Sequence, residues 1–227
     1  MYRVIKRLFD VLASALAIIL LIPLWAVIAL IIKIQSPGPA VYRARRVGLN
    51  GKIFTLYKFR TMLVDSGKIH TTTLNCDLRV FPFGAFLRKS KLDETLQLIN
   101  IIKNDMSVIG PRPEDVDNAD TMFIGDYQAI FSVKPGLSSP ASLYDYTHGE
   151  RYSLEDEYEK EFLPQKLYLE LYYVNHMSVS YDIQIIFRTV KTIVLVMYGK
   201  ELIKKPWELL SIYDSVKPAD LQYNEKL

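Results

Sequence analysis

The stretch RKSKLDETLQLINIIKNDMSVIGPRPE, residues 88–114, sets the organisation of this chain. It begins with basic residues, continues with the adjacent carboxylates Asp93 and Glu94, and ends in a Gly-Pro turn that carries Arg112. Apolar residues at helical spacing predict a helix that starts at the carboxylates, where its dipole and free N–H groups favour negative charge. A carboxylate held between Arg88 and Arg112 could attack or hold a phosphate. The alternative is an ordinary acidic helix start.

Upstream, the uncharged run from Val11 to Ile32 is long enough to cross a bilayer as a helix. Pro23 lies near its middle, where proline removes a backbone hydrogen bond and kinks a helix. Basic residues flank the run on both sides, which favours both ends staying in the cytoplasm. We therefore predict a re-entrant membrane helix, residues 1–35, that is broken at Pro23. A kinked single span is the alternative.

Positive charge is concentrated in the N-terminal quarter of the chain. Residues 1–60 contain ten Lys and Arg residues and one acid, Asp10, whereas the rest contains 18 basic and 24 acidic residues. This asymmetry predicts an anionic partner, such as phosphate groups or lipid headgroups. We predict no nucleic-acid partner, because the basic residues are interleaved with the long apolar run. The single Cys76 excludes an internal disulfide.

The predicted fold class is α+β, mainly helical, with one small β-hairpin and surface-associated amphipathic helices. Asn50-Gly51, between stretches rich in Val, Tyr, Phe and Ile, predicts the hairpin over Val41–Met62. Strand alternation places Lys58 and Arg60 on one face, which either faces solvent or binds phosphate. A last amphipathic helix, starting near Ser180, suits either the core or a membrane surface.

Several segments, taken in order, resemble the monotopic polyprenyl-phosphate phosphoglycosyl transferases, the bacterial sugar transferase family. No single segment is diagnostic, but the ordered set is specific and covers about residues 3–195. The segments are Lys6-Arg7-Leu8-Phe9-Asp10, Ser36-Pro37-Gly38-Pro39, Tyr42-Arg43, Arg46-Val47-Gly48, Tyr57-Lys58-Phe59-Arg60-Thr61-Met62, Leu87-Arg88-Lys89, Leu92-Asp93-Glu94, Asp105-Met106-Ser107, Gly110-Pro111-Arg112-Pro113-Glu114, Lys134-Pro135-Gly136, Tyr172-Tyr173 and Tyr181-Asp182-Ile183.

The resemblance implies transfer of a sugar-1-phosphate from a nucleoside diphosphate sugar, usually a UDP-sugar, to polyprenyl (undecaprenyl) phosphate. This reaction initiates bacterial glycoconjugate or polysaccharide synthesis. Asp93 would be the nucleophile that forms a phosphosugar–enzyme intermediate, which the lipid phosphate then displaces. Splitting one exchange between two anions into two displacements lets one site handle both in turn. Mg²⁺, held by Asp93, Glu94 and substrate oxygens, would neutralise the diphosphate.

The resemblance also implies roles for the residues around the Asp93–Glu94 pair and a place for the protein in the cell. The implied location is the cytoplasmic face of the bacterial inner membrane, with a monotopic helix (1–35), a membrane-associated catalytic domain (36–205) and a peripheral tail (206–227). The implied phosphate-binding residues are Arg88, Arg112 and Lys58, and the implied supporting residues are Pro111, Pro113 and Asp182.

The sequence departs from the family pattern in two places. Residues 137–142, Leu-Ser-Ser-Pro-Ala-Ser, replace the segment that usually follows Lys-Pro-Gly, and Asn104 stands where Gly is usual. We expect these changes to alter the donor preference rather than abolish activity. Two further hypotheses are a catalytically altered, membrane-anchored binding or assembly protein with the same fold, and a single-span protein whose soluble part has an unrelated function.

Overall fold

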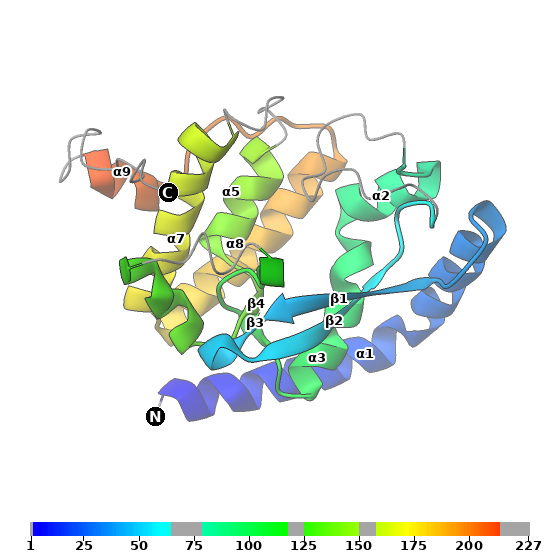
Figure 1. Cartoon of the computed structure of the whole chain (residues 1–227), viewed down its shortest axis with the longest axis horizontal. Coiled ribbons are helices and arrows are strands. Elements are labelled where there is room, and N and C mark those ends of the chain that lie inside the picture. The colour runs from blue at the N-terminus through cyan, green and yellow to red at the C-terminus, as the bar shows by residue number, and fades with distance from the viewer. Residues whose placement is uncertain (1, 65–78, 118–124, 150–157, 214–227) are drawn as a thin grey trace.

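The computed structural model describes residues 2–64, 79–117, 125–149 and 158–213. Its described part is mainly helical, with one antiparallel hairpin and one short parallel strand pair, as the predicted α+β class requires. Figure 1 shows the long N-terminal helix along one side of the molecule, the hairpin above it, and a group of upright helices beyond the hairpin.

The predicted hairpin is confirmed, with strands β1 (Val41–Val47) and β2 (Ile53–Phe59). The strands pair antiparallel, with Val47 opposite Ile53 at the turn. Asn50 and Gly51 in the turn have φ angles of 54° and 75°, a left-handed conformation that Asn and Gly adopt at low cost. The Asn-Gly pair therefore sets the register that places the two strands.

A helical segment follows, but it does not begin as a regular α-helix at the two carboxylates. Lys91 has a φ of 58° and ends the first helix, and the next turn is a 3₁₀-helix. The elements are α2 (Pro82–Ser90), η2 (Leu92–Leu96) and α3 (Gln97–Ile102). The left-handed residue turns the chain sharply, so that η2 can cross beneath β2, which it contacts.

The second sheet brings together segments from two distant parts of the chain. Strands β3 (Ser107–Ile109) and β4 (Gly136–Ser138) pair in parallel, and η3 (Gly125–Ser132) lies between them in the sequence. The backbones approach so closely that a Cβ added to Gly136 would lie 2.0 Å from the nitrogen of Gly110. Glycine is therefore required where the Gly-Pro turn meets the Lys-Pro-Gly turn.

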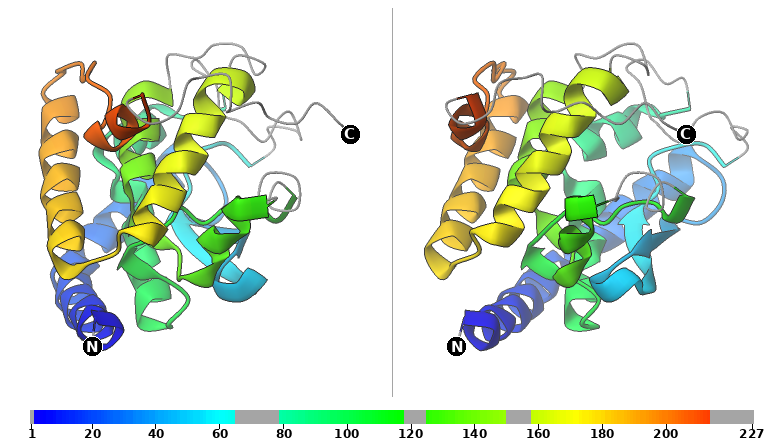
Figure 2. Two further views of the ribbon diagram at one scale, coloured as in Figure 1. Left: turned by 90° about the vertical axis from the view of Figure 1, so that its left-hand side faces the viewer. Right: turned by 60° about the vertical axis from the view of Figure 1, so that its left-hand side comes forward.

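The remaining helices form the group beyond the hairpin, and Figure 2 shows α5, α7 and α8 running alongside one another. Ser178 caps α8, two residues before the predicted start, because its side chain accepts a hydrogen bond from the nitrogen of Tyr181. In α9, Glu208 and Leu209 are buried, so this part of the predicted peripheral tail is packed. The helices are α5 (Pro140–His148), η5 (Tyr158–Phe162), α7 (Leu163–Asn175), α8 (Val179–Met197) and α9 (Trp207–Tyr213).

Helix α1 (Tyr2–Gln35) contacts the rest of the molecule near both of its ends. Near its start, the Asp10 carboxylate accepts hydrogen bonds from Ser107 Oγ (2.7 Å) and from the backbone nitrogen of Val108 (3.0 Å). Near its end, Ile28 and Ile32 are buried in a core with residues of β2 and α2. One domain therefore holds both ends of the helix.

The backbone of α1 is helical throughout, including at Pro23. The predicted break is therefore not an interruption of the helix, because one missing N–H removes only one hydrogen bond of the series. By length and composition α1 could cross a membrane. Leu12, Leu16 and Leu20 on its outer side are 61–69% exposed, so the helix presents an apolar face along its middle.

Candidate active site

The adjacent carboxylates lie on η2, in the turn that follows the left-handed Lys91. Asp93 is buried (5% exposed), and its Oδ1 atom accepts no hydrogen bond from any described residue. No side chain caps the start of η2. An acidic residue that served only to start a helix would lie exposed or accept hydrogen bonds from the first turn. The ordinary helix-start interpretation therefore does not hold for Asp93.

The electrostatic surroundings push the two carboxyl groups in opposite directions. Burial raises the pKa of Asp93, and the charge of Glu94 raises it further, against the lowering effect of Lys91 and Lys58. Burial would also raise the pKa of Glu94, but the charges of Lys91 and Arg112 outweigh it and bring this pKa well below its ordinary value. Glu94 therefore keeps its charge, and the pair titrates mainly at Asp93.

The predicted phosphate-binding residues reach the carboxylates from three different elements. Lys58 projects from β2, and burial lowers its pKa although the charges of Asp93 and Glu94 counteract this effect. Arg88 projects from the last turn of α2, where its Nε donates a hydrogen bond to Thr61 Oγ1 at 2.9 Å. The hairpin and α2 thus surround the carboxylates with fixed positive charge, as the sequence predicts.

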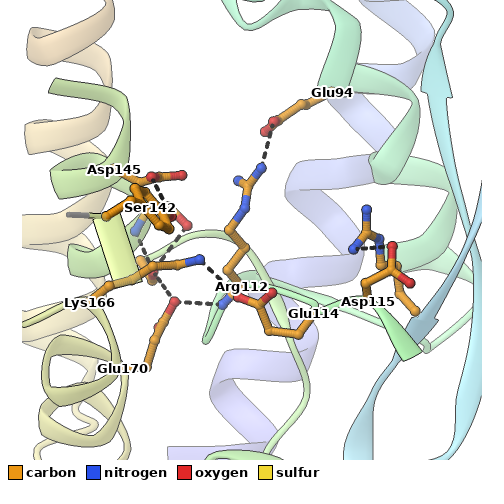
Figure 3. A network of polar contacts seen from close by, with 11 residues as sticks. Glu94, Arg112, Glu114, Asp115, Ser142, Asp145, Lys166 and Glu170 are labelled. Carbon is orange, nitrogen blue, oxygen red and sulfur yellow. Dashed lines mark hydrogen bonds and ion pairs between the residues drawn. The ribbon is translucent and has the colours of Figure 1, made fainter. Parts of the chain in front are cut away.

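The third of these residues, Arg112, lies on the Gly-Pro turn, and Figure 3 shows its guanidinium extended towards Glu94. The Nη2 atom lies 3.7 Å from Glu94 Oε1. Pro111 and Pro113 on either side are buried, and the nitrogen of Gly136 donates a hydrogen bond to the carbonyl oxygen of Pro111 at 2.8 Å. The two prolines therefore support Arg112 by fixing a buried turn.

A charged network behind this turn is absent from the sequence predictions. Glu170 Oε1 accepts hydrogen bonds from the backbone nitrogen of Arg112 (2.9 Å) and from Ser139 Oγ (3.2 Å), and Lys166 Nζ lies 3.0 Å from Glu114 Oε1 (Figure 3). The sequence carries one signal for this network. Lys166 and Glu170 lie four positions apart in an otherwise apolar helix, so they share one helical face. This face of α7 supports the turn that carries Arg112.

Two predicted residues lie apart from the carboxylates. Arg60, which strand alternation places beside Lys58, is buried, and it donates to the carbonyl oxygens of Pro37 (2.7 Å) and Ser36 (2.5 Å). Its contacts are structural. Asp182 accepts hydrogen bonds near the start of α1, so its predicted supporting role in the pocket gains no support from its position. The donors to Asp182 are Tyr2, Lys6 and Tyr173, each at 2.8 Å.

An open cavity of about 260 Å³ adjoins this charged centre. Glu94 and Arg112 lie on its wall, and most of its other lining side chains are apolar. Ile186, Val190 and Ile193 of α8 form one side, and Val190 is also 58% exposed at the molecular surface. The cavity therefore joins the charged centre to an apolar surface of α8.

Residues 137–142, where the sequence departs from the family pattern, also border this cavity. Leu137, Ser138 and Ser142 line it, and Ser138 is hydrogen-bonded to Thr189 of α8 at 2.7 Å. The altered segment thus forms part of the cavity wall. Asn104, the other departure, has a φ of 73°, a conformation that Gly adopts freely and Asn tolerates. This substitution keeps the backbone conformation.

Within the described ranges, no group of three or more His, Cys, Asp and Glu residues could enclose a metal ion. Mg²⁺ commonly needs only one or two carboxylates, because water and substrate phosphates supply its other ligands. Asp93 offers an unpaired oxygen, and Glu94 stays ionised beside it. The donor set fits Mg²⁺ bound together with a diphosphate.

Known proteins that are similar to this chain include transferases that use undecaprenyl phosphate. The chain is 36% identical over 191 residues to the UDP-glucose:undecaprenyl-phosphate glucose-1-phosphate transferase of Escherichia coli (strain K12), covering 83% of this chain and 40% of that relative. It is 37% identical over 197 residues to the UDP-N-acetylgalactosamine-undecaprenyl-phosphate N-acetylgalactosaminephosphotransferase of Aeromonas hydrophila, covering 85% of this chain and 44% of the relative.

A third relative, the exopolysaccharide production protein PSS of Rhizobium leguminosarum bv. phaseoli, is 33% identical over 194 residues, which cover 82% of this chain and 94% of the relative. The chain thus spans less than half the length of the first two relatives and nearly all of the third. The family model described as bacterial sugar transferase matches residues 1–196, which include every residue of the charged centre. The chain therefore belongs to the bacterial sugar transferase family.

Proposed function

We propose that this protein transfers a sugar-1-phosphate from a UDP-sugar to undecaprenyl phosphate, with Asp93 as the nucleophile. The observation that carries the proposal is the buried Asp93 oxygen that accepts no hydrogen bond from the described residues, although cationic side chains surround it. Leaving a buried oxygen unpaired costs free energy, so such an atom is typical of a functional site. The named activities of the relatives supply the reaction class.

In the first step, an oxygen of Asp93 attacks the phosphorus that carries the sugar, and the bond from that phosphorus to the bridging oxygen of UDP breaks. UMP leaves with the electron pair of that bond. In the second step, a phosphate oxygen of the lipid attacks the same phosphorus and Asp93 leaves as a carboxylate. Arg88 and Arg112 hold the phosphate oxygens, Lys58 reduces the repulsion between the anions, and Mg²⁺ bound at Asp93 and Glu94 would neutralise charge on the diphosphate.

The cavity beside Glu94 suits the lipid acceptor. Its apolar lining would contact the first isoprene units, while Arg112 lies where the lipid phosphate would enter. Its open side meets the exposed apolar surface of α8, from which a membrane lipid could enter without crossing water. The altered residues Ser138 and Ser142, which also line this cavity, would then influence which sugar fits beside the phosphate.

We further propose a re-entrant, monotopic placement of α1 on the cytoplasmic face of the membrane, and the contacts of its two ends support their placement on one side. A helix that crosses the bilayer has its ends on opposite sides, whereas both ends of α1 contact one domain that carries the charged site. Single cysteines introduced near residues 2 and 40 should both be labelled from the cytoplasmic side. Labelling from opposite sides would instead establish a span.

The reaction is tested by incubating purified protein with Mg²⁺, undecaprenyl phosphate and a panel of UDP-sugars and measuring UMP. We expect UMP with at least one donor, and we expect Asp93→Asn to abolish its release. No UMP from any donor would favour the alternative, a membrane-anchored binding or assembly protein of the same fold. If Asp93→Asn released UMP at the normal rate, the reaction would stand and the assignment of Asp93 would fail.

A further inference from the structure

A second cavity, of about 170 Å³, lies at the start of α1. Its walls come from the first turns of α1, from β3, from the end of the α7–α8 junction at Met177 and from the segment before β4. Ile109 of β3 lines this cavity and also the cavity beside Glu94, so β3 lies between the two. The cationic side chains on its walls are Arg3, Lys6, Arg7 and Lys134.

The anionic groups near this cavity already have partners. Asp182 forms an ion pair with Lys6 at 2.8 Å. Asp10, a carboxylate on the cavity wall, accepts hydrogen bonds from Ser107 and Val108. These contacts hold α1 against β3 and α8, and among the described residues no other cation of the cavity forms an ion pair with either carboxylate.

The remaining three cations have only uncharged partners, or none, in the described part of the chain. Arg7 donates to the backbone carbonyl oxygens of Ile101 (2.8 Å) and Ile102 (3.4 Å), and Lys134 donates to the side-chain oxygen of Asn104. Among the described residues, no carboxylate forms an ion pair with these two cations or with the exposed Arg3. The cavity therefore carries excess positive charge.

The electrostatic surroundings of Lys134 agree with the excess positive charge of this cavity. Burial lowers the pKa of Lys134, and the charge of Arg7 lowers it further, whereas the charges of Asp10 and Asp105 raise it without cancelling these effects. Two cations held close together by fixed backbone elements repel one another unless an anion lies between them. A phosphate group would accept hydrogen bonds from both and reduce this repulsion.

We propose that this cavity binds one phosphate group at the bilayer surface, supplied by an anionic phospholipid headgroup or by free phosphate. Its volume suits a phosphate with a small substituent and not a nucleoside diphosphate sugar. Val4 and Leu8, on the same turns of α1 but on the face turned away from the cavity, are 73% and 61% exposed, so these turns would lie at the membrane surface. This site goes beyond the proposed transfer reaction and does not depend on Asp93.

The test compares Lys134→Gln and Arg3→Gln with a matched control, Lys103→Gln. Lys103 lies near Asp105 (3.9 Å) and lines neither cavity. The full-length proteins are placed in nanodiscs of equal parts phosphatidylcholine and phosphatidylglycerol, and native mass spectrometry counts the phosphatidylglycerol that each protein retains. In a second arm, inorganic phosphate is titrated into protein in a zwitterionic detergent. A thermal unfolding curve for each variant checks that it is folded.

We expect one retained phosphatidylglycerol in the wild-type and control proteins and about tenfold weaker retention in both cavity variants, because each loses a charge-assisted contact. Saturable binding of inorganic phosphate with the same sensitivity, but no retained lipid, would identify free phosphate as the ligand. The proposal is overturned if the wild-type protein binds neither ligand, if both cavity variants bind as the wild type does, or if Lys103→Gln weakens binding equally.

Discussion

At the scale of single residues, the proposed chemistry depends on the contrast between two neighbouring carboxyl groups. Asp93 is buried with an unpaired oxygen, whereas Glu94 is held by Lys91 and Arg112, each with a nitrogen 3.7 Å from its Oε1 atom. One chain segment thus provides a carboxyl group with an oxygen that no described residue engages, and another that stays charged beside it. The same contrast should determine how activity depends on pH.

Transfer should fail on acidification at a higher pH than an ordinary aspartate would allow. The nucleophile must be ionised, and burial and Glu94 raise the pKa of Asp93 to about 6. We therefore expect kcat/KM to fall about tenfold per pH unit below about 6 and to level off above it. The rate of UMP release across a pH series checks this, and an unchanged rate down to about pH 4 would contradict it.

Because of Glu170, the free energy of unfolding should decrease as pH rises, whereas a carboxylate in an ordinary ion pair makes it increase. Burial raises its pKa from the ordinary value of 4.5 to about 7. Between these two pH values the folded state therefore keeps a proton that the unfolded state has lost. Stability should fall by roughly 3 kcal/mol as pH rises through this window. Urea unfolding of the wild type and Glu170→Gln measures this, and an equal pH dependence in both would refute it.

The residue-scale predictions from the sequence identified the groups that carry charge but not the groups that hold them. Asp93, Glu94, Arg88, Arg112 and Lys58 lie close enough to influence one another's charge, and their catalytic and phosphate-binding roles stay predictions. Glu170 and Lys166 were not predicted, because their partners lie 31 to 58 positions away in the sequence. Asp182 was placed with the site on resemblance alone, although its hydrogen bonds attach it to α1.

At the scale of elements, the site depends on turns that bring short segments into close contact. The turn that carries Arg112 is held against the Lys-Pro-Gly turn through the approach of Gly110 and Gly136. The hairpin holds Lys58, and the left-handed Lys91 directs η2 towards it. These contacts can be tested by adding a single methyl group.

Gly136→Ala should destabilise the protein much more than Gly51→Ala, its matched control. The new methyl group would lie 2.0 Å from the backbone of Gly110, whereas at Gly51 no atom lies within 4 Å and only the positive φ opposes alanine. We expect losses of roughly 3 kcal/mol or more and about 1 kcal/mol respectively. Chemical denaturation measures both, and equal losses would show that the two turns are not in close contact.

Element-scale predictions succeeded where a local signal fixes the backbone. Asn-Gly specified the hairpin because both residues adopt the left-handed conformation of the turn. The η2 segment was predicted as the start of an α-helix because 3₁₀ and α turns share nearly the same apolar spacing. Pro23 was expected to break α1, but the helix continues through it. Contacts with one domain hold both ends of the helix, and the sequence alone does not reveal these contacts.

At the scale of the whole molecule, two exposed apolar faces accompany the charged site. One lies along the middle of α1, and the other is on α8, where Phe187 is 71% exposed. Apolar side chains of this size exposed on long helices are typical of membrane contact. The membrane itself would then bring the lipid phosphate to the level of Arg112.

Phe187→Asp should weaken binding to lipid vesicles without changing the stability of the folded domain. The side chain makes few contacts within the protein, so its replacement removes membrane contact and little packing. We expect several-fold weaker partitioning in a flotation assay and an unfolding midpoint within a few degrees of the wild type. Tyr198→Asp, at an exposed residue just beyond the end of α8, serves as the comparison variant. Unaltered flotation of Phe187→Asp would show that the exposed face of α8 does not contact the membrane.

The central claim, that Asp93 forms the covalent intermediate, is tested most directly by intact-protein mass spectrometry. The protein is incubated briefly with Mg²⁺ and its UDP-sugar in the absence of lipid phosphate, so that the second step cannot occur. We predict a mass increase equal to one sugar phosphate, which disappears when undecaprenyl phosphate is added and is absent in Asp93→Asn. A wild-type protein that transfers the sugar phosphate without ever gaining this mass, or an equal gain in Asp93→Asn, would contradict the account.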